Sequence, residues 1–178
     1  MLLGQFNELI IDRFTSVGAY LRDEDENDVL LPKKYLTDDL VEGEEISVFI
    51  YRDSEDRLVA TTEIPKIKLG GFGYLLIKDV SPFGAFADWG LEKDLLIPFK
   101  EQHVKLEEGR QYMVSLQLDD STNRLYGTTK VDKHFKKCEI QHPVNTQVEL
   151  LIWKQTDLGY KVVVDDSYIG LVLSLIHI

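Results

Sequence analysis

Apolar and polar residues alternate with a period of two along most of this chain, which is typical of β-strands with one buried face. Val114, Leu116 and Leu118, for example, are separated by Ser115 and Gln117. The pattern predicts two sets of five strands, divided by turns rich in Asp, Ser and Gly. The strands are predicted at residues 6–14, 18–22, 28–31, 46–52 and 57–63, and at 73–81, 83–89, 94–97, 112–119 and 124–130.

The two sets of strands are copies of one unit. Gly18-Ala19-Tyr20-Leu21 returns as Gly84-Ala85-Phe86-Ala87, at an offset of 66 residues. Arg57-Leu58 returns as Arg124-Leu125 at an offset of 67, so the second copy has one extra residue in its last turn. A fixed period indicates a folding unit used more than once, and a unit of this length is a small domain.

Each copy has three strands, a longer connection with room for a short helix, and two more strands. This order is the outline of the OB-fold, a five-stranded Greek-key barrel that commonly binds oligonucleotides. The pattern by itself leaves an SH3-like barrel open. A glycine at the bend between the first two strands, Gly18 or Gly84, suits a small barrel of either kind.

The motifs of the second copy resemble the S1 motif, an RNA-binding variety of the OB-fold. The resemblance rests on Ser81-Pro82-Phe83-Gly84-Ala85-Phe86, Asp94-Leu95-Leu96-Ile97-Pro98, Glu108-Gly109-Arg110 and Asn123-Arg124-Leu125. With Thr156-Asp157-Leu158-Gly159-Tyr160-Lys161 further on, the tandem arrangement is similar to the conserved virulence factor B family of bacterial RNA-binding proteins. The resemblance implies an all-β fold of tandem five-stranded OB-fold (S1-like) barrels. Domains are expected at 1–66, 67–133 and 147–178, with a linker at 134–146.

The third of these barrels is expected to be incomplete. After Val172 the chain ends in Leu173-Ser174-Leu175-Ile176-His177-Ile178, which is similar to a translated sequencing adapter. We therefore expect residues 173–178 to be foreign to the natural protein and the third domain to be truncated. A native apolar last strand is the alternative.

Single-stranded nucleic acid is bound by exposed aromatic rings that stack on bases and by cations that contact phosphates. The second copy supplies both, and the resemblance implies that its RNA-binding residues are Phe83, Phe86, Trp89, Asp119, Arg124 and Lys130. Asp119 would orient Arg124 or contact a ribose hydroxyl. Phe83 and Phe86 are three residues apart, so on a regular strand one ring would face the core and the other the solvent. A bend at Gly84 is needed to bring both rings to the RNA-binding face.

Charge separates the two copies. The whole chain has a formal net charge of −11, and residues 1–66 carry 7 Lys and Arg against 16 Asp and Glu. Residues 67–133 carry 9 against 10. Because attraction to phosphates dominates nucleic-acid affinity, the second copy is the predicted RNA-binding domain. The first copy is predicted to be a spacer or a surface for docking on the ribosome or on RNA-processing or transcription proteins.

The sequence shows no catalytic motif, so we expect a binding protein without a cofactor rather than an enzyme. His134, Cys138 and His142 have a spacing that would align them on a helix, but they lack a fourth zinc ligand. A lone cysteine and the lack of a recognisable signal peptide predict a cytoplasmic location. No apolar run reaches the length needed to span a membrane, and no membrane partner is expected.

Overall fold

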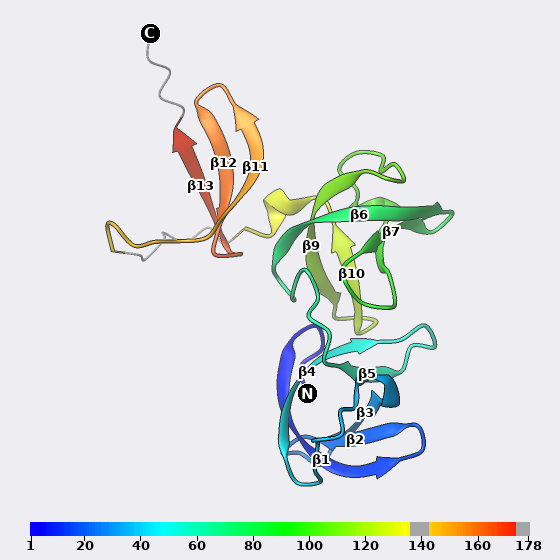
Figure 1. Ribbon diagram of the computed structural model, residues 1–178. Coiled ribbons are helices and arrows are strands. Elements are labelled where there is room, and N and C mark those ends of the chain that lie inside the picture. Colours follow the sequence, from blue (N-terminus) through cyan, green and yellow to red (C-terminus); the bar gives the residue numbers. More distant parts are fainter. Residues whose placement is uncertain (136–142, 174–178) are drawn as a thin grey trace.

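The computed structural model describes residues 1–135 and 143–173, which form an all-β structure with three sheets (Figure 1). Strands β1 and β2 are followed by β3, β4 and β5, and these five close into a barrel in the order β1-β2-β3-β5-β4. Their bounds are Phe6–Thr15, Gly18–Arg22, Asp28–Pro32, Glu45–Arg52 and Leu58–Thr61. All pairs in this barrel are antiparallel except β3 and β5, which are parallel at Leu30 and Val59. The OB-fold outline predicted from the sequence is confirmed.

The second sheet repeats the first, in the order β10-β9-β6-β7-β8, and it curls until β8 and β10 contact each other. Its strands β6 to β10 span Phe72–Ser81, Gly84–Asp88, Leu95–Pro98, Gln111–Asp119 and Arg124–Thr128. Short 3-10 helices follow the third strand of each copy, η1 at Lys33–Tyr35 and η2 at Phe99–Glu101, and η3 spans Val131–Lys133. None of the helices in the described residues has the length and apolar character needed to cross a membrane.

A third sheet contains β11 (Leu150–Thr156), β12 (Gly159–Val164) and β13 (Tyr168–Leu173). It matches the first three strands of each barrel in detail, because the first strand of all three copies carries a β-bulge. The register shifts lie between Ile11 and Arg13, between Ile77 and Asp79, and between Ile152 and Lys154. Bulges increase the local twist of a strand, as a small barrel requires.

The bend between the first two strands is also the same in all three copies. A hydroxyl at the end of the first strand donates to the carbonyl of the glycine that opens the second. These bonds join Thr15 to Gly18 at 2.8 Å, Ser81 to Gly84 at 3.2 Å and Thr156 to Gly159 at 2.9 Å. The three glycines have φ values of +154°, +150° and +143°. The sequence predicted this role for the first two glycines.

The third sheet differs from the barrels in what covers its apolar face. Leu150, Ile152 and Val172 occupy the positions at which Leu9, Ile11 and Leu31 fill the interior of the first barrel. In the third sheet these side chains are exposed. The three sheets fall inside the three predicted domains, whose exact boundaries stay a prediction.

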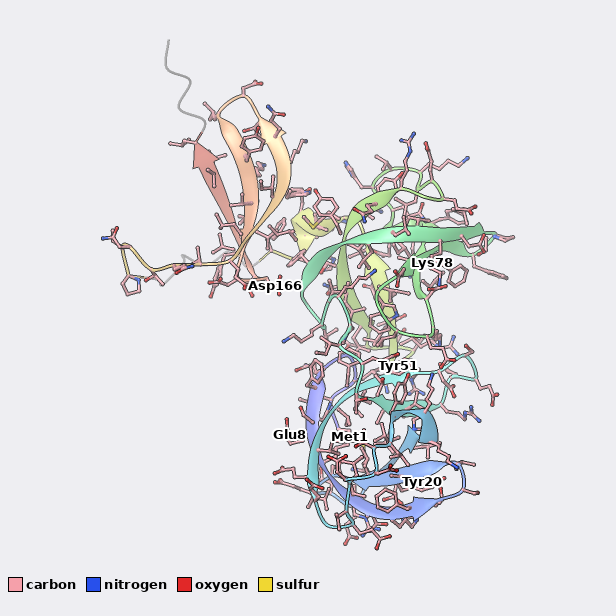
Figure 2. The ribbon with its side chains drawn as sticks, in the orientation of Figure 1. Met1, Glu8, Tyr20, Tyr51, Lys78 and Asp166 are labelled. Atoms are coloured by element: carbon pink, nitrogen blue, oxygen red, sulfur yellow. The ribbon has the colours of Figure 1, made fainter. Side chains whose placement is uncertain are left out.

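The two barrels share a hydrophobic core at their junction. Phe49 and Tyr51 of β4 pack with Trp89 and Leu91 of the second copy in one buried cluster. Figure 1 shows the β4–β5 hairpin beside the β9–β10 end of the second barrel, and Figure 2 shows Tyr51 at this junction. The shared core holds the first barrel against the second.

Phe135 connects the second barrel to the third sheet. Its ring is buried, stacks on Phe72 at 4.8 Å between centroids, and tilts against Trp153 at 5.2 Å. Phe135 belongs to the segment 134–146 that was predicted to be a linker, so at least the start of that segment is packed. The rest of this segment is described from Pro143 onward.

Candidate nucleic-acid interface

The turn between β6 and β7 presents the first predicted contact residue. The Ser81 hydroxyl accepts from the Phe83 N–H at 3.2 Å and donates to the Gly84 carbonyl, which fixes the turn. A Cβ atom at Gly84 would lie 2.4 Å from the carbonyl oxygen of Ile97, so only glycine lets β7 run this close to β8. The Phe83 ring is 77% exposed.

Phe86 lies on the outer face of the second barrel. Its neighbours Ala85 and Ala87 are fully buried in the core, and strand alternation therefore directs Phe86 outward. Phe86 pairs with Leu96 on β8 and is half-buried. Both predicted rings are thus accessible, Phe83 from the turn and Phe86 from the strand.

Arg124 starts β10 and reaches across to the first barrel. Its Nη2 lies 2.7 Å from Oδ2 of Asp56, which belongs to the turn between β4 and β5. The hydrogen bond from Arg124 holds the pKa of the Asp56 carboxyl below its ordinary value. Arg124 also lines a cleft between the barrels, and Phe86 lines the same cleft. The structure therefore brings these two predicted residues together.

The Asp119 carboxylate is bonded within its own turn. Its Oδ1 accepts from the N–H of Ser121 at 3.0 Å and from the Ser121 hydroxyl at 2.6 Å. These bonds stabilise the β9–β10 turn and lower the pKa of Asp119. The prediction that Asp119 orients Arg124 is wrong, because Arg124 pairs with Asp56; a ribose contact from Asp119 stays a prediction.

Lys130 lies at the opposite end of the second barrel from the cleft residue Arg124. Its Nζ donates to the carbonyl of Lys100, next to the exposed ring of Phe99. Phe99 follows Pro98, which pairs with Gly84, so Phe99 and Phe83 share one end of β7 and β8. Phe99 was not predicted as a contact, although an aromatic directly after the third strand is a signal that could have found it.

Trp89 is not available for stacking on a base. Its side chain is 3% exposed and forms edge-to-face contacts with Phe49 at 5.9 Å and Tyr51 at 6.3 Å. The indole N–H donates to the carbonyl of Lys93 at 2.6 Å. The prediction that Trp89 contacts RNA is therefore wrong, because the ring is buried in the core that the two barrels share.

The matching face of the first barrel is occupied by its own ion pairs. Arg13 lies over the ring of Tyr20, which is the counterpart of Phe86, at 4.4 Å from the ring centroid. Asp12 and Asp28 each pair with both Arg13 and Arg22. The arginines of this face are neutralised by carboxylates, which supports the prediction that the second copy is the better nucleic-acid surface.

Metal ligands do not gather in the part of the chain that the structure describes: no group of three or more His, Cys, Asp or Glu residues there could hold an ion. Of the residues with zinc-like spacing, Cys138 and His142 lie outside the described residues.

Comparisons with known proteins give a family match for the first copy of the repeated unit. Residues 3–63 match the family model of the S1 domain. The match falls on the first copy, although the S1-like motifs were recognised in the second. Both copies share strand order, bulge and glycine bend, so the second copy has the same fold as the matched region.

Two curated relatives match about half of the chain. YitL of Bacillus subtilis is 40% identical over 95 residues, which cover 53% of this chain and 32% of that protein. Conserved virulence factor B of Staphylococcus epidermidis is 34% identical over 95 residues, covering 51% of this chain and 31% of that protein. The chain spans about a third of the length of these relatives.

A solved structure has the same fold over nearly the whole chain. It is a multidomain protein with nucleic acid binding domains from Streptococcus pneumoniae, with a TM-score of 0.63 and 19% identity, covering 96% of this chain and 62% of that one. The resemblance predicted from the repeated motifs is confirmed: residues 3–63 match the S1 domain model, and the chain is similar to the conserved virulence factor B proteins.

Proposed function

We propose that this chain binds single-stranded RNA through the outer face of its second barrel and acts without catalysis. The observation that carries this proposal is the outward Phe86 on β7 beside Arg124 at the start of β10. Middle strands and the loops that flank them are where OB-folds bind oligonucleotides. The exposed ring of Phe83 extends the same face at the β6–β7 turn.

The comparisons support a nucleic acid as the ligand. The S1 match concerns a domain type that the sequence motifs linked to RNA, and the related Streptococcus pneumoniae structure is described as having nucleic acid binding domains. We further propose a cytoplasmic protein that acts in post-transcriptional control of gene expression. Residues 67–133 are close to neutral, so the affinity should be modest and should fall with added salt.

The test is a titration of the whole chain with a fluorescently labelled single-stranded RNA of ten nucleotides, at 50 and 200 mM salt. Stacking of one base on an aromatic ring contributes about 1–3 kcal/mol. Phe86→Ala should therefore weaken binding about 5- to 150-fold. The matched control is Tyr20→Ala, the same position in the first barrel, which should leave affinity unchanged. A DNA strand of the same sequence measures the preference for RNA.

A docking module is the second candidate, and the charge of the first barrel favours it. Residues 1–66 carry a large excess of acidic side chains that would suit a basic protein surface on the ribosome or on RNA-processing machinery. No binding of RNA at 50 mM salt, or binding that Phe86→Ala leaves unchanged, would overturn RNA binding by the second barrel and favour this alternative.

A further inference from the structure

The junction of the two barrels contains an open cleft of about 270 Å³. Side chains from both barrels line it, the first contributing its β4–β5 hairpin and the second its β7, β8 and β10 strands with the loop between β7 and β8. The residues relevant here are Arg52, Asp56, Phe86, Lys93 and Arg124. The cleft therefore adjoins the face proposed to bind RNA, and four of its twelve lining residues belong to the acidic first barrel.

The cleft gathers cations that have few carboxylate partners. Arg52 donates from Nε to the carbonyl of Asn123 at 3.0 Å and from Nη1 to the carbonyl of Asp56 at 2.6 Å. Lys93 donates from Nζ to the carbonyl of Asp53 at 2.6 Å. Backbone carbonyls orient these cations but do not neutralise them.

Asp56 supplies the one ion pair that Arg52, Lys93 and Arg124 form within residues 1–135 and 143–173. The cleft carboxylate of Asp94 is paired with Lys78 at 2.9 Å. The cleft thus holds more positive than negative charge, in a chain whose net charge is −11. Burial lowers the pKa of the Lys93 ammonium group, while the charges of Asp56 and Asp53 oppose this shift.

Asp56 occupies the place that a phosphate would take on Arg124. One carboxylate oxygen accepts from both Nε, at 3.3 Å, and Nη2, at 2.7 Å, of the guanidinium. Phosphate oxygens bind the same guanidinium edge with the same geometry. A phosphate group entering the cleft would compete with Asp56 for Arg124 and would meet Arg52 and Lys93 beside it.

We propose that the cleft is a composite site for one phosphodiester of a bound RNA strand, with Arg52 of the first barrel and Lys93 and Arg124 of the second contacting the phosphate while Phe86 stacks on the adjacent base. This inference rests on the proposed function and adds that the first barrel contributes directly to binding. Asp56 acts as an internal competitor, which lowers affinity for RNA by occupying Arg124 when no strand is bound.

The test uses the whole chain and the ten-nucleotide RNA, with two cleft variants that should change the affinity for RNA in opposite directions. Arg52→Gln removes a phosphate contact, so it should weaken binding about five- to tenfold and reduce the slope of log affinity against log salt by about 0.7. Asp56→Asn removes the competing charge and should tighten binding about fivefold. Arg57→Gln is the matched control, because Arg57 lies on the same hairpin but pairs with Asp53 and Glu55.

The possible results distinguish phosphate binding in the cleft from RNA binding on the outer face of the second barrel alone. If Phe86→Ala weakens binding while Arg52→Gln and Asp56→Asn both behave as the wild type, the second barrel binds RNA but the cleft does not, and the inference is wrong. If Arg57→Gln weakens binding as much as Arg52→Gln, the effect is general electrostatics and the inference is also wrong. Tighter binding by Asp56→Asn cannot arise from damaged folding, so it supports the cleft even if Arg52→Gln lowers stability.

Discussion

Replacement of Trp89 by alanine should destabilise the two barrels together. A buried tryptophan removes roughly 150–250 Å² from water. At about 25 cal/mol per Å² this burial contributes about 4–6 kcal/mol, which is an upper bound because the unfolded chain already buries part of the ring. Measured losses for Trp→Ala in protein cores are about 3–5 kcal/mol, and we expect Trp89→Ala to fall in this range.

The contacts of the indole explain why the loss should affect both barrels. Trp89 belongs to the second copy, but its edge-to-face partners Phe49 and Tyr51 lie on β4 of the first. Each aromatic pair contributes about 0.5–1.5 kcal/mol beyond the area that it buries. Trp89→Phe should cost less, about 1–3 kcal/mol, because it keeps an aromatic ring but leaves the Lys93 carbonyl without its donor.

The assay is urea unfolding followed by far-ultraviolet circular dichroism, with Phe83→Ala as the control. Phe83 is 77% exposed, so its replacement should change the free energy of unfolding by less than about 0.5 kcal/mol. A loss below about 1 kcal/mol in Trp89→Ala would refute the shared core. Refutation would also follow if only one barrel lost stability, because a shared core couples the two.

Three further predictions follow from the geometry. Gly84→Ala should cost at least about 1–3 kcal/mol in thermal or urea unfolding, because the new Cβ meets the carbonyl of Ile97 at a φ of +150°; wild-type stability would contradict this. Arg124 lowers the pKa of Asp56 below 3.8, so the stabilisation by this pair is present above that pH and is lost as the pH falls through the folded pKa. The difference in unfolding midpoint between the wild type and Asp56→Asn should therefore vanish in acid, and a constant difference from pH 6 to pH 2 would contradict it. Phe135→Ala should release the third sheet from the second barrel and speed proteolysis between residues 135 and 150; unchanged digestion would count against the packing seen here.

The sequence predicted the strands closely because local signals define them. Period-two alternation and Asp-rich turns placed both barrels' strands within about three residues of the observed bounds. Gly84 was assigned to the correct bend because it lies between two predicted strands, and its φ of +150° agrees with that position. Such features depend on residues close together in the chain, and a single sequence contains that information.

Contacts between barrels could not be predicted in this way. Trp89 directly follows β7, and a tryptophan at such a position was predicted to be an exposed ring that stacks on a base. It is buried only because the first barrel lies against it. Net charge also leaves the local placement of cations undetermined. The sum over residues 1–66 is strongly negative, yet Arg52 lies where three cations meet, and a total charge says nothing about local placement.

The one-residue difference between the last turns explains how a repeated arginine acquired a new partner. In the first copy, Arg57 pairs within its own turn with Asp53, four residues earlier. In the longer second turn the equivalent Asp119 is held by Ser121, and Arg124 is left to pair with Asp56 of the other barrel. The copy with the longer hairpin therefore has an ion pair between domains, where the other copy has one within its own turn. Both copies keep the same strand order, and Arg124 lies at the junction of the barrels, where Arg52 and Lys93 line the same cleft.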